Sequence, residues 1–306
     1  MLNIFSLEQL NQSLAIKLEQ TAFSLKGETV QRWANGMFSN NIRKLQPNQG
    51  NYSAICDDRG RVQGFIYLYC LDKESFLCIL DGISEEAFLK RFQMYIILDD
   101  IDFEETDLEL FHLCGKQAIE ILQSENIPLP EDGLLTEFSD GFIFRSQRFG
   151  VEGYDILHRN ADWLETQNAT SLSTEETDAI RIFHGRAKWP QDGTDKSMIH
   201  ELGLNEECCA FDKGCYVGQE IINRLDVKGL INKKIQRLEL VEGLFIPDDN
   251  TVELQLDGKK IGRLSSFTSV KIDDNIQHFA LGTIRKKAWE KGTLLQTKQG
   301  QVWKLS

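Results

Sequence analysis

The residues best suited to chemistry lie in one short segment, Lys213-Gly214-Cys215-Tyr216-Val217-Gly218-Gln219-Glu220, which a helical pattern of apolar residues follows directly. A cysteine that follows a lysine and precedes a helix N-terminus has two reasons for a lowered thiol pKa. Cys215 could therefore be a thiolate nucleophile, a redox sensor or a ligand for iron. It could equally be a small buried residue in a tight loop, because free cysteines are among the most buried residues.

Neighbouring cysteines raise the question of a metal site in the same segment. Cys208 and Cys209 lie within eight residues of Cys215, so three thiolates could in principle hold iron or a cluster. Adjacent cysteines seldom bind one metal together, and apart from the nearby His200 no fourth ligand is evident. The five histidines form no HxxxH or HxH group. We therefore expect no permanent metal.

The composition is that of a globular protein with a sizeable core. The chain has 306 residues, of which 41% are hydrophobic and 26% charged, and this length predicts two or three domains. No apolar run is long enough to span a bilayer, and the N-terminus lacks the features of a secretory signal. The seven cysteines include no CxxC pair. An odd number of cysteines without such pairs favours reduced thiols in a cytoplasm.

Charge is distributed unevenly along the chain. Residues 1–227 contain 20 Lys/Arg and 38 Asp/Glu, whereas residues 228–306 contain 14 and 9. Such a change in sign is typical of a domain boundary. Two interpretations remain open: two solvated surfaces of opposite sign, or a C-terminal module that faces an anionic partner such as tRNA.

Periodicity predicts the elements that must position the cysteine segment. A capping box at Ser6 with leucines at helical spacing through Leu18 predicts an N-terminal helix, and a second helix follows from about Glu28. Residues 52–69 read as a hairpin that turns at residues 57–60. Ser173 begins a further helix that ends near Gly185. After about residue 232 the chain changes to short strands separated by Gly, Asp and Asn, which predicts a small β-barrel.

The cysteine segment, continued by Arg224 and Gly229, resembles the signature of the YgfZ family, folate-binding proteins related to the aminomethyltransferase (T-protein) of the glycine cleavage system. Weaker resemblances follow in the expected order along most of the chain. They comprise the hairpin from Tyr52 to Val62, Gly153 to Leu157, Arg181 to Gly185, Ile261 to Ser266 and Ala280 to Gly282.

The resemblance implies an α+β, multidomain aminomethyltransferase-like fold with a small C-terminal β-barrel. Residues 1–230 would form two interlocked folate-binding domains and residues 231–306 the barrel. Together they would surround a central hole that accepts tetrahydrofolate or a derivative. The resemblance also implies a role in maintaining iron–sulfur enzymes, including those that modify tRNA. The expected partners are therefore a reduced folate and iron–sulfur enzymes or assembly proteins, with direct tRNA contact left open and no membrane.

Several positions depart from the family pattern. An aspartate pair that supports chemistry at the folate nitrogen in the aminomethyltransferases aligns with Gly64 and Phe65, and neither can stabilise a developing cation. Glycine-cleavage activity is therefore not expected. Aromatic residues of the YgfZ folate site align with Gln20 and Thr177, which removes stacking partners for a flat pterin ring.

The resemblance assigns roles to individual residues. Neighbouring side chains of a strand point to opposite sides, so only one of Tyr154 and Asp155 should point inward. If that residue is Asp155, its carboxylate could accept hydrogen bonds from a pterin; otherwise Asp155 is a strand-end carboxylate in solvent. Arg181 could anchor the glutamate tail of folate or be an exposed helix residue. Cys215 would be the functional thiol. The motif residues expected to contribute are Lys213, Gly214, Cys215, Tyr216, Gly218, Gln219, Glu220 and Arg224.

Three functions from different classes remain open at this point. The motif favours a folate-binding accessory protein for iron–sulfur cluster assembly or repair, with no defined catalysis. A folate-dependent aminomethyltransferase is the second, and the third is a thiol-redox or cluster-carrier protein that does not need folate.

Overall fold

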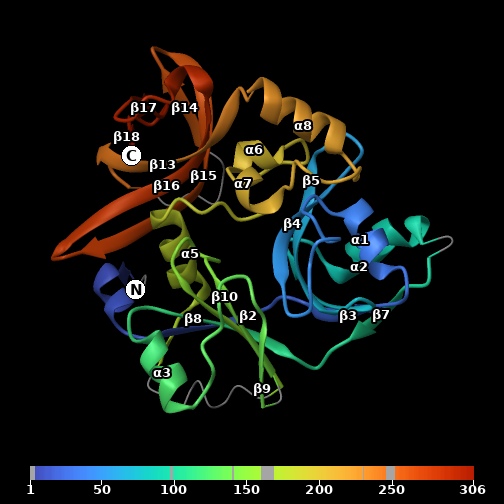
Figure 1. Cartoon of the computed structure of the whole chain (residues 1–306). Coiled ribbons are helices and arrows are strands. Elements are labelled where there is room, and N and C mark those ends of the chain that lie inside the picture. Colours follow the sequence, from blue (N-terminus) through green and yellow to red (C-terminus); the bar gives the residue numbers. More distant parts are fainter. Residues whose placement is uncertain (1–3, 97–98, 140, 160–168, 230, 246–251) are drawn as a thin grey trace.

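The computed structural model describes residues 4–96, 99–139, 141–159, 169–229, 231–245 and 252–306. Three β-sheets dominate this part of the chain, and short helices cover or connect them (Figure 1). None of the described helices is both long and apolar enough to cross a membrane. The predicted α+β fold class with a C-terminal barrel is confirmed.

The first sheet has five strands in the order β4-β5-β6-β3-β7. Its strands are β3 (Ala22–Lys26), β4 (Gly50–Cys56), β5 (Val62–Asp72), β6 (Ser75–Asp81) and β7 (Asp102–Glu105). Helices α1 (Val30–Met37) and α2 (Glu85–Phe92) pack on one face, where Trp33 and Phe88 meet Ile66. The opposite face contacts the second sheet through aromatic side chains. Burial on both faces explains why β5 is an almost continuous apolar run.

The second sheet has six strands in the order β12-β2-β8-β11-β10-β9. Its strands are β2 (Leu14–Leu18), β8 (Glu109–Cys114), β9 (Thr136–Phe138), β10 (Gly141–Ser146), β11 (Gly153–His158) and β12 (Thr170–Ser171). Helix α3 (Ala118–Ser124) covers its outer face, and Ile121 and Leu122 pack against Ile156 there. The inner face meets the first sheet, so the two sheets share one core.

Six strands near the C-terminus close into a barrel. They are β13 (Lys233–Glu242), β14 (Val252–Leu256), β15 (Lys259–Ile272), β16 (Asn275–Arg285), β17 (Leu294–Gln296) and β18 (Val302–Leu305), with the 3₁₀ turn η3 (Lys286–Ala288) after β16. Pairing of β15 with β16 closes the ring, and Trp303 fills its interior with no exposed area. Strand β1 (Phe5–Ser6) from the N-terminus pairs in parallel with β15. The boundary at residues 230/231 stays a prediction.

Four of the described helices follow the second sheet in the chain. They are α5 (Thr174–Phe183), α6 (Ile199–Leu202), α7 (Asn205–Cys208) and α8 (Gln219–Lys228). Helix α5 lies between that sheet and the barrel, whereas α6, α7 and α8 lie beside β4 and β5 of the first sheet (Figure 1). The capping box predicted at Ser173 is present: its hydroxyl accepts from the Glu176 N–H, and the Glu176 carboxylate accepts from the Ser173 N–H.

The predicted N-terminal helix is wrong beyond its first turn. Ser6 does cap a 3₁₀ helix, η1 (Leu7–Asn11), but residues 14–18 form β2. Leu14 and Ile16 are buried while Lys17 is exposed, so burial alternates as in a strand. Leucines four residues apart fit both the 3.6-residue period of a helix and the two-residue period of a strand. Pairing with β8 makes this segment a strand. Strand β17, only three residues long, was not predicted.

Candidate functional site

The cysteine segment forms a loop at the surface, directly before α8. Cys215 is exposed, whereas the other six cysteines are buried, and all seven are free thiols. The thiol lies in a shallow depression of about 400 Å³. Two carboxylates, Asp58 and Glu220, line the depression with it. The interpretation of Cys215 as a buried space-filling residue is therefore wrong.

The two glycines of the loop differ in what they do. Gly218 has φ +85°, and a Cβ there would lie 2.6 Å from the carbonyl oxygen of Asp57. The loop therefore packs against the β4–β5 turn only because this residue is glycine. A Cβ at Gly214 would meet no atom within 4 Å, so packing places no demand on that residue.

Lys213 holds the loop in place. Its ammonium donates to the carbonyl oxygens of Asn35, Phe38 and Asn40 at 2.7, 2.7 and 2.6 Å, just where α1 ends. Cations are stabilised at helix C-termini, where carbonyl groups lack partners. Burial lowers the pKa of Lys213 to about 8. Because the ammonium donates hydrogen bonds to all three carbonyl oxygens, the lysine anchors the loop.

The remaining polar residues of the motif have different surroundings. Gln219 donates weakly to the Lys213 carbonyl at 3.5 Å and so ties the ends of the loop together. The Tyr216 ring is buried with the Lys213 ammonium 4.8 Å from its centroid. Arg224 is exposed on α8.

Asp155 and Tyr154 are both buried on β11. The Asp155 carboxylate is fully enclosed, with His112 Nδ1 2.6 Å from Oδ1 and Arg148 Nε 2.9 Å from Oδ2. Burial alone would raise the pKa of this carboxyl, but Arg148 and then His112 outweigh that effect and lower it to about 2. The alternative of a solvated carboxylate is therefore wrong, and Asp155 is a buried anion that fixes Arg148.

Arg148 connects this ion pair to a second carboxylate. Its Nη1 donates to Gln20 Oε1 at 2.7 Å, and Gln20 Nε2 donates to Asp81 Oδ1 at 2.9 Å. Tyr52 donates its hydroxyl to the other oxygen of Asp81 at 2.7 Å. Burial and the Asp81 charge raise the pKa of Tyr52, so that its hydroxyl stays protonated. A continuous polar chain therefore joins both sheets.

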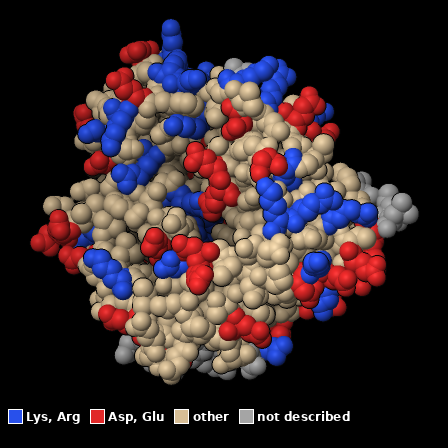
Figure 2. Space-filling view, viewed as in Figure 1, with Lys and Arg blue, Asp and Glu red and all other residues tan. Residues whose placement is uncertain are grey.

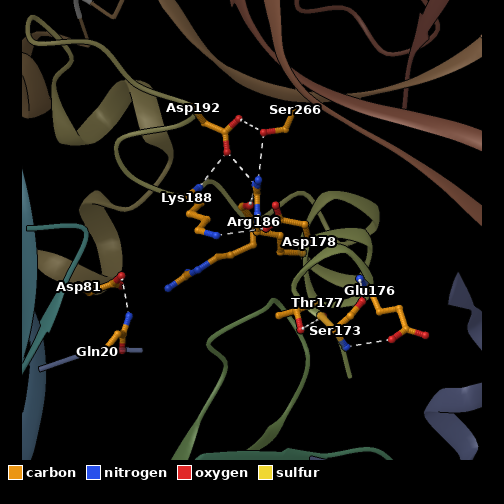
Figure 3. A network of polar contacts seen from close by, with 11 residues as sticks. Gln20, Asp81, Ser173, Glu176, Thr177, Asp178, Arg186, Lys188, Asp192 and Ser266 are labelled. Carbon is orange, nitrogen blue, oxygen red and sulfur yellow. Dashed lines mark hydrogen bonds and ion pairs between the residues drawn. The ribbon is translucent and has the colours of Figure 1, made fainter. Parts of the chain in front are cut away.

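Arg181 is only 2% exposed, so the alternative of an exposed helix residue is wrong. Its guanidinium donates to Asp178 at 2.7 Å, to Asp192 at 2.8 Å and to Ser266 of the barrel at 3.0 Å. Asp192 also accepts from the Lys188 N–H and from Ser266 (Figure 3). Most donors of Arg181 are thus occupied by protein groups, and they tie α5 to β15.

A pocket of about 710 Å³ lies between the two sheets, bounded by β4, β5, β10, β11 and α3. The lining of this pocket includes five aromatic residues: Tyr52, Tyr67, Tyr69, Phe144 and Tyr154. Figure 2 shows a hollow near the centre of the molecule, with acidic and basic side chains around it. The rings of Tyr52 and Tyr67, partners in the β4–β5 register, stack with centroids 4.2 Å apart.

Two basic residues lie over this aromatic wall: the Arg148 guanidinium is 4.5 Å from the Tyr67 ring centroid, and Arg186 lies over Tyr52. The Arg186 guanidinium lies 5.9 Å from the Tyr52 ring centroid and pairs with both oxygens of Glu207, a residue of the pocket lining. In Figure 3 its side chain extends toward Asp81 and Gln20. The pocket therefore combines flat apolar walls with charged groups of both signs, which suits a polar ligand with a planar ring.

Comparisons with known proteins agree with this architecture. The family model of the GCVT N-terminal domain matches residues 19–130. An aminomethyltransferase of Staphylococcus carnosus is 23% identical over 91% of this chain and 80% of its own. The tRNA-modifying protein YgfZ of Hamiltonella defensa is 24% identical over 82% of this chain and 76% of its own. The crystal structure of glycine cleavage system aminomethyltransferase T from Bartonella henselae superposes with a TM-score of 0.84 at 16% identity, covering 98% of this chain and 87% of that one.

The chain is thus similar in sequence both to a YgfZ protein and to aminomethyltransferases, and it shares the fold of the latter. A putative chloroplastic transferase of Arabidopsis thaliana is more similar in sequence, 31% identical over 86% of this chain, but this chain spans only 63% of its length.

The departures from the aminomethyltransferase pattern at Phe65 and from the YgfZ pattern at Gln20 and Thr177 have clear structural counterparts. Phe65 is buried in the aromatic wall, 5.3 Å from the Tyr52 ring, and its register partner on β6 is Asp81. A carboxylate is thus present on the neighbouring strand beside Phe65. Gln20 belongs to the polar chain, and Thr177 is buried with its hydroxyl donating to the Ser173 carbonyl.

Three residues of the pocket region were missed from the sequence: Asp81, Arg148 and Arg186. Asp81 directly follows the apolar, strand-like segment Ser75–Leu80 and precedes Gly82, a position where a functional side chain could have been suspected. Arg148 and Arg186 lie in irregular segments without any periodic signal. Within the described ranges no group of three His, Cys, Asp or Glu side chains could hold a metal ion.

Proposed function

We propose that this chain is a YgfZ-type protein that binds a reduced folate in the pocket between its two N-terminal sheets. We further propose that it serves as an accessory protein for iron–sulfur enzymes, including enzymes that modify tRNA. The observation that carries the folate proposal is the aromatic pocket joined to the Asp81–Gln20–Arg148 chain. A pterin ring stacks favourably on aromatic side chains, and its N–H groups need carboxylate or carbonyl acceptors.

The pocket has room and charge for the rest of a folate. A volume of about 710 Å³ lies within the usual range for sites that take ligands of this size. Lys116 and Arg145 are exposed residues of the lining and can face the carboxylates of a glutamate tail. Arg145 already pairs with Asp132 at 2.7 Å, whereas Lys116 has no ion pair with any residue that the structure describes.

The exposed thiol supports the accessory role. Cys215 lies outside the pocket lining, in a depression that a protein surface can reach. The relative named tRNA-modifying protein YgfZ points to the same process.

Asp81 favours an aminomethyltransferase as the second candidate. It is a carboxylate beside the position at which the transferases are expected to carry theirs, and it lies within reach of the aromatic wall. A carboxylate there could stabilise a cation that develops at a folate nitrogen.

Calorimetric titration with 5-formyltetrahydrofolate tests the folate proposal. We expect saturable 1:1 binding by the wild type and clearly weaker binding by Asp81→Asn, which keeps the shape of the side chain and removes its charge. Asp212→Asn is the matched control, because Asp212 is an exposed residue paired only with Lys44. An absence of binding up to millimolar folate, or equal binding by the Asp81 variant and wild type, would contradict the proposal.

A further inference from the structure

A second concave site lies at the junction of α6, α8 and the barrel, away from the aromatic pocket. It has a volume of about 640 Å³. Four cations line it, Lys233, Arg285, Lys286 and Lys287, against one carboxylate, Glu201. Figure 2 shows basic side chains gathered over the upper part of the molecule, where Figure 1 places the barrel and α8. We call this site the basic pocket.

The β-sheet register forces two of these cations together. Lys233 at the start of β13 is the direct partner of Arg285 at the end of β16. Like charges opposite each other in an antiparallel pair are destabilising. Lys233 is partly neutralised by Glu201 at 3.2 Å. Arg285, Lys286 and Lys287 are exposed and form no ion pair with the described part of the chain. Such an arrangement is stabilised when an anion binds between them.

A buried side chain with unused hydrogen-bonding capacity also lines the basic pocket. His200 is 3% exposed, and neither of its ring nitrogens has a hydrogen-bond partner among the described residues. The nearest charge is the Asp226 carboxylate, 3.5 Å from Nε2. Nδ1 is therefore the ring nitrogen of His200 that lacks any partner among the described residues, and a polar ligand would remove the energetic cost of burying it.

An aromatic residue beside the basic pocket narrows the choice of anion. The Lys234 and Lys286 ammonium groups lie 4.6 and 6.0 Å from the Trp289 ring centroid. The indole N–H donates to the Ile284 carbonyl at 2.8 Å, which fixes the ring. Cations interleaved with a fixed, partly exposed aromatic ring are typical of surfaces that bind single-stranded nucleic acids.

The geometry points to the basic pocket as a binding site for the backbone phosphates of a nucleic-acid strand, held by Arg285, Lys286 and Lys287. The net charge of the chain is −13, so a nucleic acid would be repelled by most of the surface and directed to this site. This inference does not depend on folate binding, because no residue lines both pockets.

Salt-dependent binding of a fluorescein-labelled U12 RNA, measured by fluorescence anisotropy on the full chain without folate, tests the inference. Each phosphate contact on a single strand contributes about −0.7 to the slope of log K against log salt. The double variant Lys286→Gln/Lys287→Gln should therefore flatten the slope by about 1.4. The control Lys259→Gln/Lys304→Gln removes the same charge from exposed barrel positions outside the basic pocket and should leave the slope unchanged.

Three results would overturn the inference. The wild type could fail to bind U12 even at 50 mM salt. The pocket variant and its control could lose affinity equally, which would mean that only overall charge matters. Inorganic pyrophosphate could displace the RNA at equal concentration, which would restrict the site to small phosphate ligands. A thermal melt of both double variants separates these results from loss of folding.

Discussion

Replacement of Asp155 by asparagine tests the buried ion pair at the centre of the polar chain. The substitution keeps the side-chain shape but removes the negative charge that faces Arg148, which is 7% exposed. Breaking a buried pair by removing one partner leaves the other charge uncompensated and costs about 3–5 kcal/mol. We expect a loss of that size in the free energy of unfolding at pH 7.

The pKa of Asp155 gives an independent estimate of the same interaction. It is lowered from 3.8 to about 2. At 1.36 kcal/mol per pKa unit, this shift is equivalent to roughly 2 kcal/mol of stabilisation of the folded state. Because the folded-state pKa is below the unfolded value, this contribution is complete above about pH 5. It is lost as the pH falls through 4 toward 2. The stability difference between wild type and Asp155→Asn should shrink over the same interval.

Urea denaturation followed by tryptophan fluorescence and far-ultraviolet circular dichroism measures both effects. Asp132→Asn is the control, because Asp132 pairs with Arg145 at the surface and such pairs contribute less than about 1 kcal/mol. Adding Arg148→Met to Asp155→Asn should restore part of the stability, because the unpaired charge is then removed. The reasoning would be refuted if Asp155→Asn cost no more than Asp132→Asn, or if its effect were undiminished at pH 3.

Three further predictions follow from the glycines and the exposed thiol. Gly50→Ala places a Cβ 2.1 Å from the Tyr69 ring, so the melting temperature should fall by the equivalent of about 1–3 kcal/mol and calorimetry should show weaker folate binding. Gly218→Ala should lower thermal stability by at least about 1 kcal/mol because of its positive φ and its contact with Asp57, whereas Gly214→Ala should be neutral. Cys215→Ala should change stability by less than about 0.5 kcal/mol, since the thiol is exposed, yet abolish support of iron–sulfur enzyme activity in cells depleted of the native protein. Normal enzyme activity in those cells would show that the thiol has no functional role.

Local patterns in the sequence were sufficient to predict most elements of the fold. The hairpin of β4 and β5 follows from a turn flanked by apolar alternation, and α5 follows from its capping box. The prediction of a helix at Leu14–Leu18 was wrong for a physical reason. The apolar pattern of this short segment fits both a helix and a strand, so its secondary structure depends on pairing with a partner strand. That partner, β8, lies almost a hundred residues further along the chain.

The surroundings of the candidate site residues were harder to predict from the sequence, because they too depend on residues far apart in the chain. Asp155 could be recognised as a candidate, but its partner His112 comes from another strand of the sheet. The environment of Arg181 depends on Ser266, 85 residues away in the barrel. Whether a charged residue faces a ligand or a protein partner depends on such long-range pairings, and periodicity carries no information about them.

The first 26 residues contribute one strand to each of the three sheets: β1 to the barrel, β2 to the six-stranded sheet and β3 to the five-stranded sheet. During synthesis Phe5 can pair with Val270 only after Val270 has left the ribosome. At about 5–20 residues per second that delay is on the order of ten seconds to a minute. In that interval β3 can already pair with β6, while the segment before it is exposed. Completion of the barrel sheet is therefore coupled to the synthesis of β15, and a nascent chain that stalls before β15 leaves the buried Phe5 side chain available to chaperones and proteases.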